Sequence, residues 1–422
     1  MKRYDLIVVG GGLTGSAAAI AASRNGLKVL LVEKSGALGG AACNCLVNPF
    51  MRYWTNVDER GEKKCLDLSR GIFSEIHNRL ASSNMTIMGT ELYFHEEYLK
   101  FTLDNMMEEA GVQVLFHCVL CGVEMQDKKI KSITLATKSG NLEFEADYYI
   151  DATGDADLSV MAGFPYRLGR QEDNLCQPMT LCFRVGNINE EDFFKSNKDM
   201  QLLYKELQSQ GIIKNPREDV LWFRTLIDGV IHFNTTRIVK LNPVDPFDVS
   251  KAEALAREQM FEIVDFLQKN VKGCENCQLL FSASEIGVRE SRMICGEYVL
   301  SKEDIISCTK FDDAIAACNY EIDIHNPEGG GTSHYFFPEG EYYTIPYRAL
   351  QPKDTVNLLT AGRCISSTHE AQASYRIMPT CCCLGEAAGV AVSVAKKSDV
   401  TVRDADVDVI RKILADNGAF VG

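Results

Sequence analysis

Short apolar runs and helical segments alternate over the first fifty residues. Residues 5–9 (DLIVV) are apolar and rich in β-branched side chains, as is typical of a buried parallel strand. Residues 16–23 are alanine-rich and predict a helix, which Asn25-Gly26 would end. A second apolar run covers residues 28–32. The order of these segments predicts a strand–helix–strand unit.

The pattern predicts further elements along the chain. Apolar residues at helix-like spacing predict that residues 64–111 are mostly helical. Residues 127–150 are typical of a hairpin, with its turn at Gly140 and the asparagine that follows. An amphipathic helix is expected over residues 250–270 and an apolar helix over 379–395.

Composition narrows the classes of partner. The chain has 422 residues, 46% hydrophobic content and 24% charged content, close to soluble globular proteins. The formal net charge is −14 and no run of lysine or arginine is present, which disfavours nucleic acid and anionic membrane surfaces. No uninterrupted apolar run reaches about 18 residues, so we expect no transmembrane helix.

The cysteines and the N-terminus bear on location. Sixteen cysteines in a chain of this length and apolar content favour reduced thiols over a disulfide scaffold. The basic start mimics a signal peptide, but Tyr4 and Asp5 interrupt it and three glycines split the apolar run. We therefore expect a cytoplasmic protein.

The glycines after the first strand have the G-x-G-x-x-G spacing. Gly10 allows a tight turn, Gly12 allows a pyrophosphate to approach the backbone, and Gly15 allows the helix to pack closely on the strand. The helix N-terminus then presents free N–H groups to the phosphates. Glu33 ends the second strand, where a carboxylate can bind a ribose diol. The unit therefore predicts dinucleotide binding.

Three other segments favour FAD over NAD. A second glycine pair, Gly39-Gly40, suits close approach to a long cofactor. Residues 148–155 (YYIDATGD) and 357–363 (NLLTAGR) are both strands that end in a glycine turn. The apolar helix that follows could point its N-terminus at a flavin carbonyl and stabilise charge on the reduced ring. No second G-x-G-x-x-G appears, so a separate NAD domain is not expected.

These motifs carry a resemblance to a known family. The chain resembles FAD-dependent oxidoreductases whose dinucleotide domain is of the fumarate reductase and succinate dehydrogenase flavoprotein type. The resemblance rests on GGGLTG, DATGDADLSVMAG, GVRESRMICGEYVL, DIHNPEGGG, IPYRALQP and the long block AGRCISSTHEAQASYRIMPTCCCLGEAAGVA.

The resemblance implies a set of FAD contacts. The expected contact residues are Gly10, Gly12, Leu13, Thr14, Gly15, Glu33, Lys34, Gly39, Gly40, Ala41, Val119, Ala152, Thr153, Gly154, Asp155, Gly362, Arg363, Pro379, Thr380 and Cys381. Within this set the backbone of Val119 matches the adenine-side contact. The sequence departs from the family pattern at Cys43-Asn44-Cys45, where small or hydroxyl residues are usual.

The expected fold is α/β. A Rossmann-like FAD-binding domain with a central parallel sheet covers residues 1–164 and 348–400, and a second, α+β substrate domain over 165–347 interrupts it. Residues 401–422 are expected to add a C-terminal helix. An active site between the two domains follows from this arrangement.

The candidate catalytic residues are arginines and histidines in the family-like blocks, namely Arg289, Arg292, His325, His369 and Arg376. The working hypothesis is that an arginine grips an anionic substrate while His325 or His369 shuttles a proton. The ordinary alternatives are that Arg289 pairs with Glu290 or Glu285, and that His325 caps a turn.

Cysteine pairs raise the question of metal or redox chemistry. Cys118 and Cys121 would face opposite sides of a strand, and Cys274-x-x-Cys277 has no second pair nearby, so no metal site is expected. The three cysteines from Cys381 lie at a helix start, which lowers thiol pKa values, although packing beside the flavin is the simpler role.

The sequence thus predicts an FAD-dependent oxidoreductase that transfers a hydride between flavin and a small organic substrate, an anionic one if the arginines bind it. Two alternatives stay open, a non-redox flavin-dependent isomerase or dehydratase and a flavin electron-relay subunit. The electron acceptor or donor is not identified, and a homodimer is the default expectation.

Overall fold

The computed structural model describes residues 2–59, 61–83, 86–87 and 92–422. Its central sheet has the order β7-β2-β1-β10-β9-β8, and β21 pairs with β10. The parallel strands are β1 (Lys2–Val9), β2 (Val29–Val32), β7 (Gln113–Leu115), β10 (Gly140–Asp151) and β21 (Leu358–Thr360). Strands β8 (Val119–Gln126) and β9 (Lys129–Thr137) continue the sheet antiparallel.

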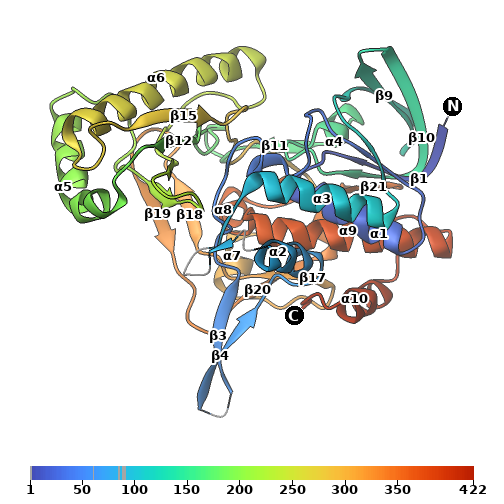
Figure 1. Cartoon of the computed structure of the whole chain (residues 1–422). Coiled ribbons are helices and arrows are strands. Elements are labelled where there is room, and N and C mark those ends of the chain that lie inside the picture. The colour runs from blue at the N-terminus through green and yellow to red at the C-terminus, as the bar shows by residue number, and fades with distance from the viewer. Residues whose placement is uncertain (1, 60, 84–85, 88–91) are drawn as a thin grey trace.

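Helices cover one face of this sheet (Figure 1). They are α1 (Leu13–Arg24), α2 (Ile72–Ser82), α3 (Glu96–Ala110) and α9 (Met378–Ser398). Side chains of β1 alternate, so that Leu6 and Val8 join the core under these helices. Ile7 and Val9 face the opposite core, which the curled strands β8 and β9 and the short α4 (Asp157–Met161) close. The sheet is therefore apolar on both faces, as a mostly parallel sheet should be.

Helix α9 packs against α1 so closely that the backbones of the two helices are in contact. A Cβ added at Gly385 would lie 2.0 Å from the Thr14 carbonyl oxygen, and one at Gly389 would lie 2.2 Å from that of Ala18. By length and composition α9 is long and apolar enough to cross a membrane. The sequence prediction of no transmembrane helix did not anticipate this, because it considered only uninterrupted apolar runs. However, 94% of its most apolar window is buried inside the protein, so the helix is explained by the core that it fills.

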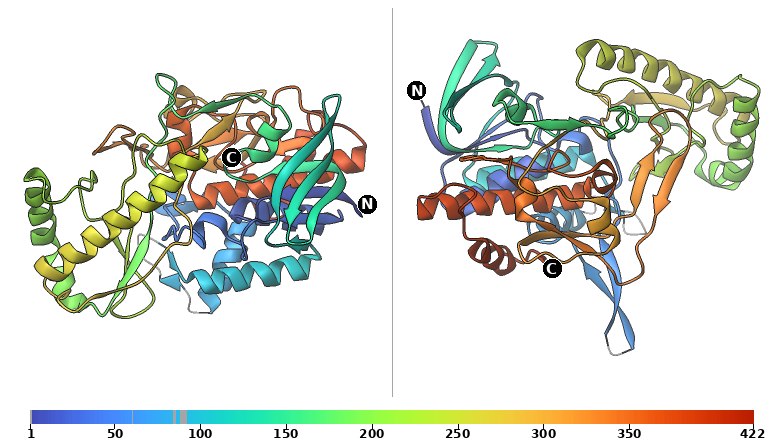
Figure 2. Two further views of the ribbon diagram at one scale, coloured as in Figure 1. Left: turned by 90° about the horizontal axis from the view of Figure 1, so that it is seen from above. Right: turned by 180° about the vertical axis from the view of Figure 1, so that it is seen from behind.

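A second sheet forms a separate lobe (Figures 1 and 2). Its order is β13 (Trp222–Arg224), β14 (Ile231–Phe233), β12 (Phe183–Gly186) and β15 (Gln278–Ser282). One face packs on α5 (Glu190–Ser209) and α6 (Pro246–Asn270), with Phe183 and Phe233 stacked 5.3 Å apart. Helix α6 begins four residues before the predicted start, because Asp245 caps it and Pro246 fits the first turn.

Short pairs of strands complete the structure. They are β3 (Trp54–Glu59) with β4 (Glu62–Asp67), β5 (Thr86–Ile87) with β6 (Tyr93–Phe94), β11 (Tyr166–Leu168) with β16 (Arg292–Ile294), β17 (Ala314–Cys318) with β20 (Tyr343–Pro346), and β18 (Ile322–His325) with β19 (Thr332–Tyr335). The remaining helices are α7 (Lys302–Ile306), α8 (His369–Tyr375) and α10 (Val407–Asp416), with 3₁₀ turns at Gly40–Ala42 and Tyr347–Leu350.

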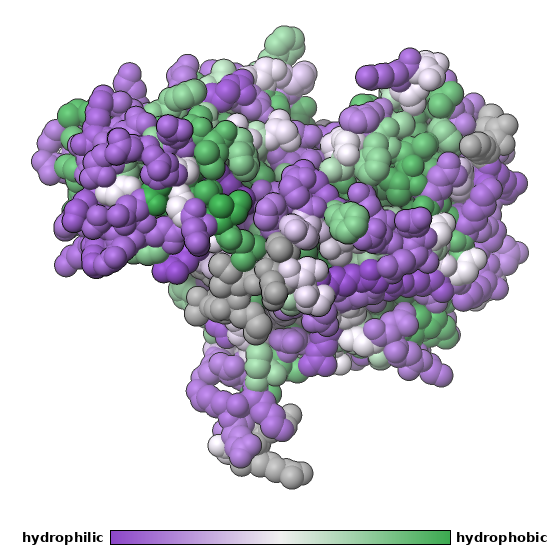
Figure 3. All heavy atoms as spheres, in the orientation of Figure 1, coloured by the Kyte–Doolittle hydropathy of each residue, from purple (hydrophilic) through white to green (hydrophobic). Residues whose placement is uncertain are grey.

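Two sequence predictions need correction. Residues 64–111 contain the helices α2 and α3, but 64–67 belong to β4 and pair with β3, and 86–87 pair with 93–94 as β5 and β6. Residues 84–85 and 88–91 of this range lie outside the described residues. The β3–β4 hairpin extends away from the body and presents mainly hydrophilic side chains (Figures 1 and 3). The hairpin predicted over 127–150 is confirmed as β9 and β10, but Gly140 opens the second strand and the turn lies just before it.

Two ion pairs, one buried and one exposed to solvent, connect the lobe to the central part. Glu96, at the start of α3, binds Arg184 of β12 through a 2.7 Å contact between side chains that are both almost fully buried. Lys34, just after β2, pairs with Glu285 of the second lobe at 3.0 Å. The buried pair is the stronger of the two links between the lobe and the central part, because exposed ion pairs are screened by solvent.

We expect Gly389→Ala to destabilise the protein, because its Cβ would meet the Ala18 carbonyl and push α9 from α1. The free energy of unfolding should fall by about 1–3 kcal/mol, measured by urea unfolding of the FAD-loaded protein. Gly329→Ala is the matched control, since nothing lies within 4 Å of its added Cβ. Equal stability of the two variants would contradict the packing argument.

Glu386 on α9 should make stability depend on pH. Burial raises the pKa of this carboxyl from 4.5 to about 7, although the Ile72 N–H bond opposes the shift. The folded state therefore holds the proton more tightly, and stability falls as pH rises between about 4.5 and 7, by up to about 3 kcal/mol. Glu386→Gln should remove this fall in the pH dependence of urea unfolding, and a variant that keeps it would exclude Glu386 as its source.

Candidate active site

The glycine turn after β1 brings three backbone segments into contact. Gly10 has φ 101° and donates its N–H to the Val32 carbonyl at 2.8 Å. A Cβ at Gly15 would lie 1.8 Å from the Gly10 carbonyl oxygen, so only glycine lets α1 start this close to the turn. A Cβ at Gly12 would meet nothing nearer than Gly40 at 3.8 Å. Gly12 therefore leaves its backbone open toward a ligand, as the motif predicts.

A cleft of about 400 Å³ opens over this turn. Glu33 lines it and accepts N–H bonds from Gly11 at 2.6 Å and from Ser35 at 2.7 Å. Arg363 lines it from the end of β21 and pairs with Asp155 at 2.7 Å. The Nε of Arg363 is buried and has no hydrogen-bond partner among the described residues. Open glycine backbone, a carboxylate and a partly buried guanidinium are groups that fit a dinucleotide.

Most residues that the resemblance implied as cofactor contacts line this cleft. They are Gly10, Gly12, Leu13, Thr14, Glu33, Lys34, Gly39, Gly40, Ala41, Ala152, Thr153, Gly154, Asp155, Gly362, Arg363 and Cys381. Gly15 is instead taken up by helix packing, and Pro379 and Thr380 lie in the first turn of α9 without lining the cleft. Val119 is half-exposed at the start of β8, where the preceding residue donates its N–H to the Glu33 carbonyl.

The second lobe also contributes to the cleft, which the sequence did not indicate. Its contributing residues are Pro243, Val249, Glu253, Glu285, Ile286 and Val288. Residues in α6 and in the segments before and after it thus form part of the cleft wall. Apart from Val288, which lies in the GVRESRMICGEYVL block, no motif marks these residues, because their role follows from the docking of the lobe.

Cysteines near the cleft are unreactive thiols by their environment. Burial raises the pKa of Cys45 and of Cys381 to about 12. The predicted lowering of thiol pKa at the start of α9 is therefore wrong, since burial outweighs the helix N-terminus. Cys118 is buried and Cys121 exposed, as predicted. Across the described part of the chain, no group of three His, Cys, Asp or Glu side chains is placed to hold a metal ion.

A second cavity of about 550 Å³ adjoins the cleft. The two share Ala41, Val288, Arg363, Arg376 and Met378 as lining residues. Residues of β18, β19 and the second sheet form its other walls. A molecule in this cavity would therefore lie next to whatever occupies the inner end of the cleft.

Arg289 supplies positive charge to this cavity. Its Nη1 donates to the Pro178 carbonyl at 2.7 Å and to the Thr180 hydroxyl, and its Nη2 donates to Asn234 at 3.3 Å. None of its partners among the described residues is a carboxylate, so the suggested pairing with Glu290 or Glu285 is wrong. Burial and the charge of Arg376 lower the pKa of Arg289 to about 9, which still leaves it cationic at neutral pH.

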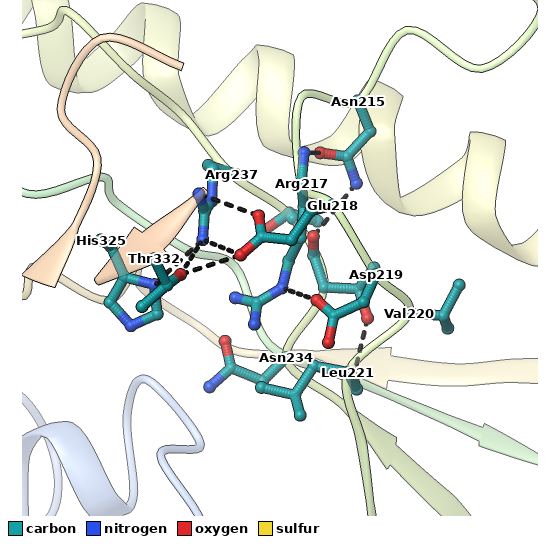
Figure 4. Close-up of polar contacts among 12 residues, drawn as sticks. Asn215, Arg217, Glu218, Asp219, Val220, Leu221, Asn234, Arg237, His325 and Thr332 are labelled. Atoms are coloured by element: carbon teal, nitrogen blue, oxygen red, sulfur yellow. Dashed lines mark hydrogen bonds and ion pairs between the residues drawn. The ribbon is translucent and has the colours of Figure 1, made fainter. Parts of the chain in front are cut away.

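His325 lies in the cavity wall on β18 (Figure 4). Arg237 Nη2 lies 3.0 Å from its Nδ1, and because a guanidinium only donates, Nδ1 accepts. The ring proton is then on Nε2, which faces Asp323 at 3.3 Å. Burial and the charge of Arg289 lower the pKa of His325 to about 3 despite Asp323. The ring is therefore neutral, and it does more than cap a turn.

The charged residues behind His325 had no sequence signal (Figure 4). Arg237, only 1% exposed, binds Glu218 at 3.1 Å. Arg217 binds Asp219 through Nε at 2.8 Å, while its buried Nη1 has no partner within the described ranges. These residues come from the segment before β13 and the one after β14, outside the blocks that carry the family resemblance.

The other predicted catalytic residues separate into two groups. Arg376, at the end of α8, lines both the cleft and the second cavity. His369 and Arg292 line neither of them. His369 Nδ1 lies 2.7 Å from Glu290, and Arg292 pairs with Asp157 and donates to the Asp155 carbonyl. The structure therefore brings Arg289, His325 and Arg376 together and directs His369 and Arg292 elsewhere.

Comparison with curated proteins gives short local matches. A segment of 41 residues is 58% identical to dihydrolipoyl dehydrogenase of Trypanosoma brucei brucei, over 10% of this chain and 9% of that protein. A segment of 40 residues is 50% identical to dihydrolipoamide dehydrogenase of Chaetomium thermophilum, over 10% and 8%. The chain thus matches less than a tenth of the length of either relative.

Solved structures align over nearly the whole chain at low identity. A geranylgeranyl bacteriochlorophyll reductase-like protein of Thermoplasma acidophilum is 13% identical, covering 98% of this chain and 82% of its own, with a TM-score of 0.46. The myxobacterial chondrochloren halogenase is 13% identical over 100% and 81%, with a TM-score of 0.46. p-Nitrophenol 4-monooxygenase of Pseudomonas putida is 11% identical over 99% and 85%, with a TM-score of 0.44.

The decisive match is to a family. Residues 5–414 match the family described as FAD dependent oxidoreductase. This range includes the glycine turn, the cleft, the second cavity and α9. The protein therefore belongs to the FAD-dependent oxidoreductase family and is a redox enzyme with FAD as its cofactor.

Proposed function

We propose that this enzyme exchanges a hydride between FAD and a small anionic organic substrate bound in the second cavity. The observation that carries the proposal is Arg289, a partly buried guanidinium on the cavity wall whose hydrogen-bond partners among the described residues are all neutral. Asp323 on the same wall interacts with Arg289 only at longer range, and an anionic ligand bound directly to Arg289 would supply a counter-charge in close contact.

The cleft fits the cofactor. The open backbone at Gly12 and the start of α1 would hold the pyrophosphate, and Glu33 would bind the ribose. The shared residues Arg363 and Arg376 place the inner end of the cleft next to the second cavity. When bound, FAD supplies a carrier that takes up or releases two electrons.

Arginines orient the substrate in this proposal. Arg289 and Arg376 lie close enough for the charge of one to lower the pKa of the other. Arg376 Nε and Arg217 Nη1 are buried and have no hydrogen-bond partner within the residues that the structure describes. A carboxylate or phosphate can accept pairs of N–H bonds from such guanidinium groups. The cavity thus offers donors for an anionic group beside the flavin site.

Of the two histidines considered as proton carriers, His325 and His369, only His325 lies in the cavity where the substrate is proposed to bind. It lines the cavity, whereas His369 lies outside both cavities. Its neutral ring keeps a proton on Nε2 toward Asp323, and Arg237 holds its orientation through Nδ1. We propose that His325 takes part as a neutral ring that donates to Asp323 and holds this carboxylate in the cavity wall at neutral pH.

The first measurement is the visible absorption spectrum of the purified protein, repeated on the supernatant after acid precipitation. We expect flavin bands, and a released cofactor with the mass of FAD. Anaerobic bleaching of the flavin by carboxylates, phosphates and their neutral analogues then tests the substrate class. If neutral analogues bleach the flavin as fast as the anions do, the anionic-substrate proposal is wrong.

Replacement of Arg289 should weaken anion binding. With oxalate as probe and the flavin absorption band as readout, Arg289→Gln should raise the dissociation constant by about 10–100-fold, because a charged hydrogen-bonding partner is lost. Arg292→Gln is the matched control, since Arg292 pairs with Asp157 outside the cavity. Equal effects of the two substitutions would argue against Arg289 as the anion site.

A further inference from the structure

We propose that Gln177 and Gln372 form a chain of two amides that positions Arg376 and His325 relative to Arg289. This inference rests on the proposed function of the second cavity. Both glutamines are buried, each with 1% of its surface exposed, and neither lines the cavity. They are positioning residues, because they act through the side chains that face the substrate.

The chain consists of four hydrogen bonds in sequence. Gln372 Nε2 donates to the backbone carbonyl of Arg289 at 2.8 Å. Gln372 Oε1 accepts from Gln177 Nε2 at 3.2 Å. Gln177 Oε1 then accepts from Arg376 Nη2 at 3.4 Å and from the backbone N–H of His325 at 3.3 Å. The three cavity residues come from separate segments of the chain, and these two amides connect them.

The orientation of the two side-chain amides is fixed by the groups at the two ends of the chain of hydrogen bonds, which are the Arg289 carbonyl at one end and the Arg376 and His325 donors at the other. The Arg289 carbonyl can only accept, so it selects the NH₂ group of Gln372. The oxygen of Gln372 must then face Gln177, whose NH₂ group points toward it. This leaves the oxygen of Gln177 for Arg376 and the His325 N–H, both of which can only donate. A flip of either amide would oppose two acceptors or two donors, so the arrangement has one stable form.

The backbone of Gln177 is anchored as well. Its N–H donates to Glu290 Oε2 at 2.8 Å, and Glu290 Oε1 lies 2.7 Å from His369 Nδ1. Glu290 is completely buried. Burial alone would lower the pKa of His369, but the hydrogen bond and charge of Glu290 raise it overall. His369 thus has a role outside the cavity, as the outer partner of the carboxylate that holds Gln177.

An amide at this position also preserves charge. The contact of Arg376 with Gln177 is to a neutral oxygen, and its contact with Asp323 is longer, at 3.8 Å. The guanidinium is thereby held in place without being neutralised at close range. This combination suits a residue that must present its charge to an anionic substrate.

The test uses the FAD-loaded protein with oxalate as the probe and the flavin absorption band as the readout. Gln177→Met and Gln372→Met remove the amides at nearly constant side-chain length. Each should raise the dissociation constant of oxalate by about 3–10-fold, since a positioned hydrogen bond is lost. FAD content should stay that of the wild type. If Gln177→Met fails to fold, Gln372→Met alone carries the measurement.

The double variant distinguishes a chain from two separate contacts. If the amides act as one unit, the dissociation constant of oxalate for the double variant should not exceed the larger of the two single-variant values. If instead the double variant raises the dissociation constant by the product of the two single fold-increases, the amides act separately and the proposed chain is wrong. Gln351→Met is the matched control, because this glutamine is also buried but donates to the Val402 carbonyl away from the cavity. It should leave oxalate affinity unchanged.

Two outcomes separate this inference from the proposed function. If Arg289→Gln weakens oxalate binding while both methionine variants keep wild-type affinity, the positioning role is wrong and the anion site stands. If the wild-type protein binds neither oxalate nor other small carboxylates, the proposed function fails, and the positioning role fails with it.

Discussion

The backbone contact between α1 and α9 is the constraint on which the rest of the structure depends. Gly385 and Gly389 let α9 lie directly on the carbonyl groups of α1. The last part of the chain is thereby fixed to the first, and Gly362 and Arg363 come to line the same cleft as Gly10 and Gly12. Since the cleft is made of residues hundreds of positions apart, it exists only when these helices meet.

Charge in the second cavity follows a consistent arrangement. Arg217 and Arg237 have acidic partners, whereas Arg289 is held by neutral oxygens. The acidic groups thus neutralise the guanidinium groups at the back of the cavity. Within the described part of the chain, Arg289 and Arg376 have no side-chain carboxylate within hydrogen-bond distance, although Asp323 lies on the same wall, 3.8 Å from Arg376. A strongly acidic chain, with a net charge of −14, thus lines this cavity with arginines as well as carboxylates.

The sequence was sufficient for the parts of the fold that depend on local rules. The strand–turn–helix unit at Gly10, the strands before Gly154 and Gly362, and α9 each follow from apolar runs and glycine positions. The cleft residues follow from the same motifs together with the family resemblance. These features are predictable because the backbone itself provides the binding groups.

Side-chain roles were harder, because they depend on partners that the sequence does not place. His369 and Arg292 have the right chemistry, yet Glu290 and Asp157 turn them away from the cavities. Arg217 and Arg237 lie in segments without a motif, and only the fold brings them behind His325. The predicted helix over 64–111 failed at its start because apolar spacing does not report strand pairing.

The position of the second lobe has a consequence for how the enzyme is assembled. Lys34 beside the cleft pairs with Glu285 of the lobe, and residues in and around α6 complete the cleft wall. If FAD occupies this cleft as proposed, cofactor binding and lobe docking are linked equilibria, and each stabilises the other. The rate at which FAD dissociates would then report how firmly the lobe is held against the cleft.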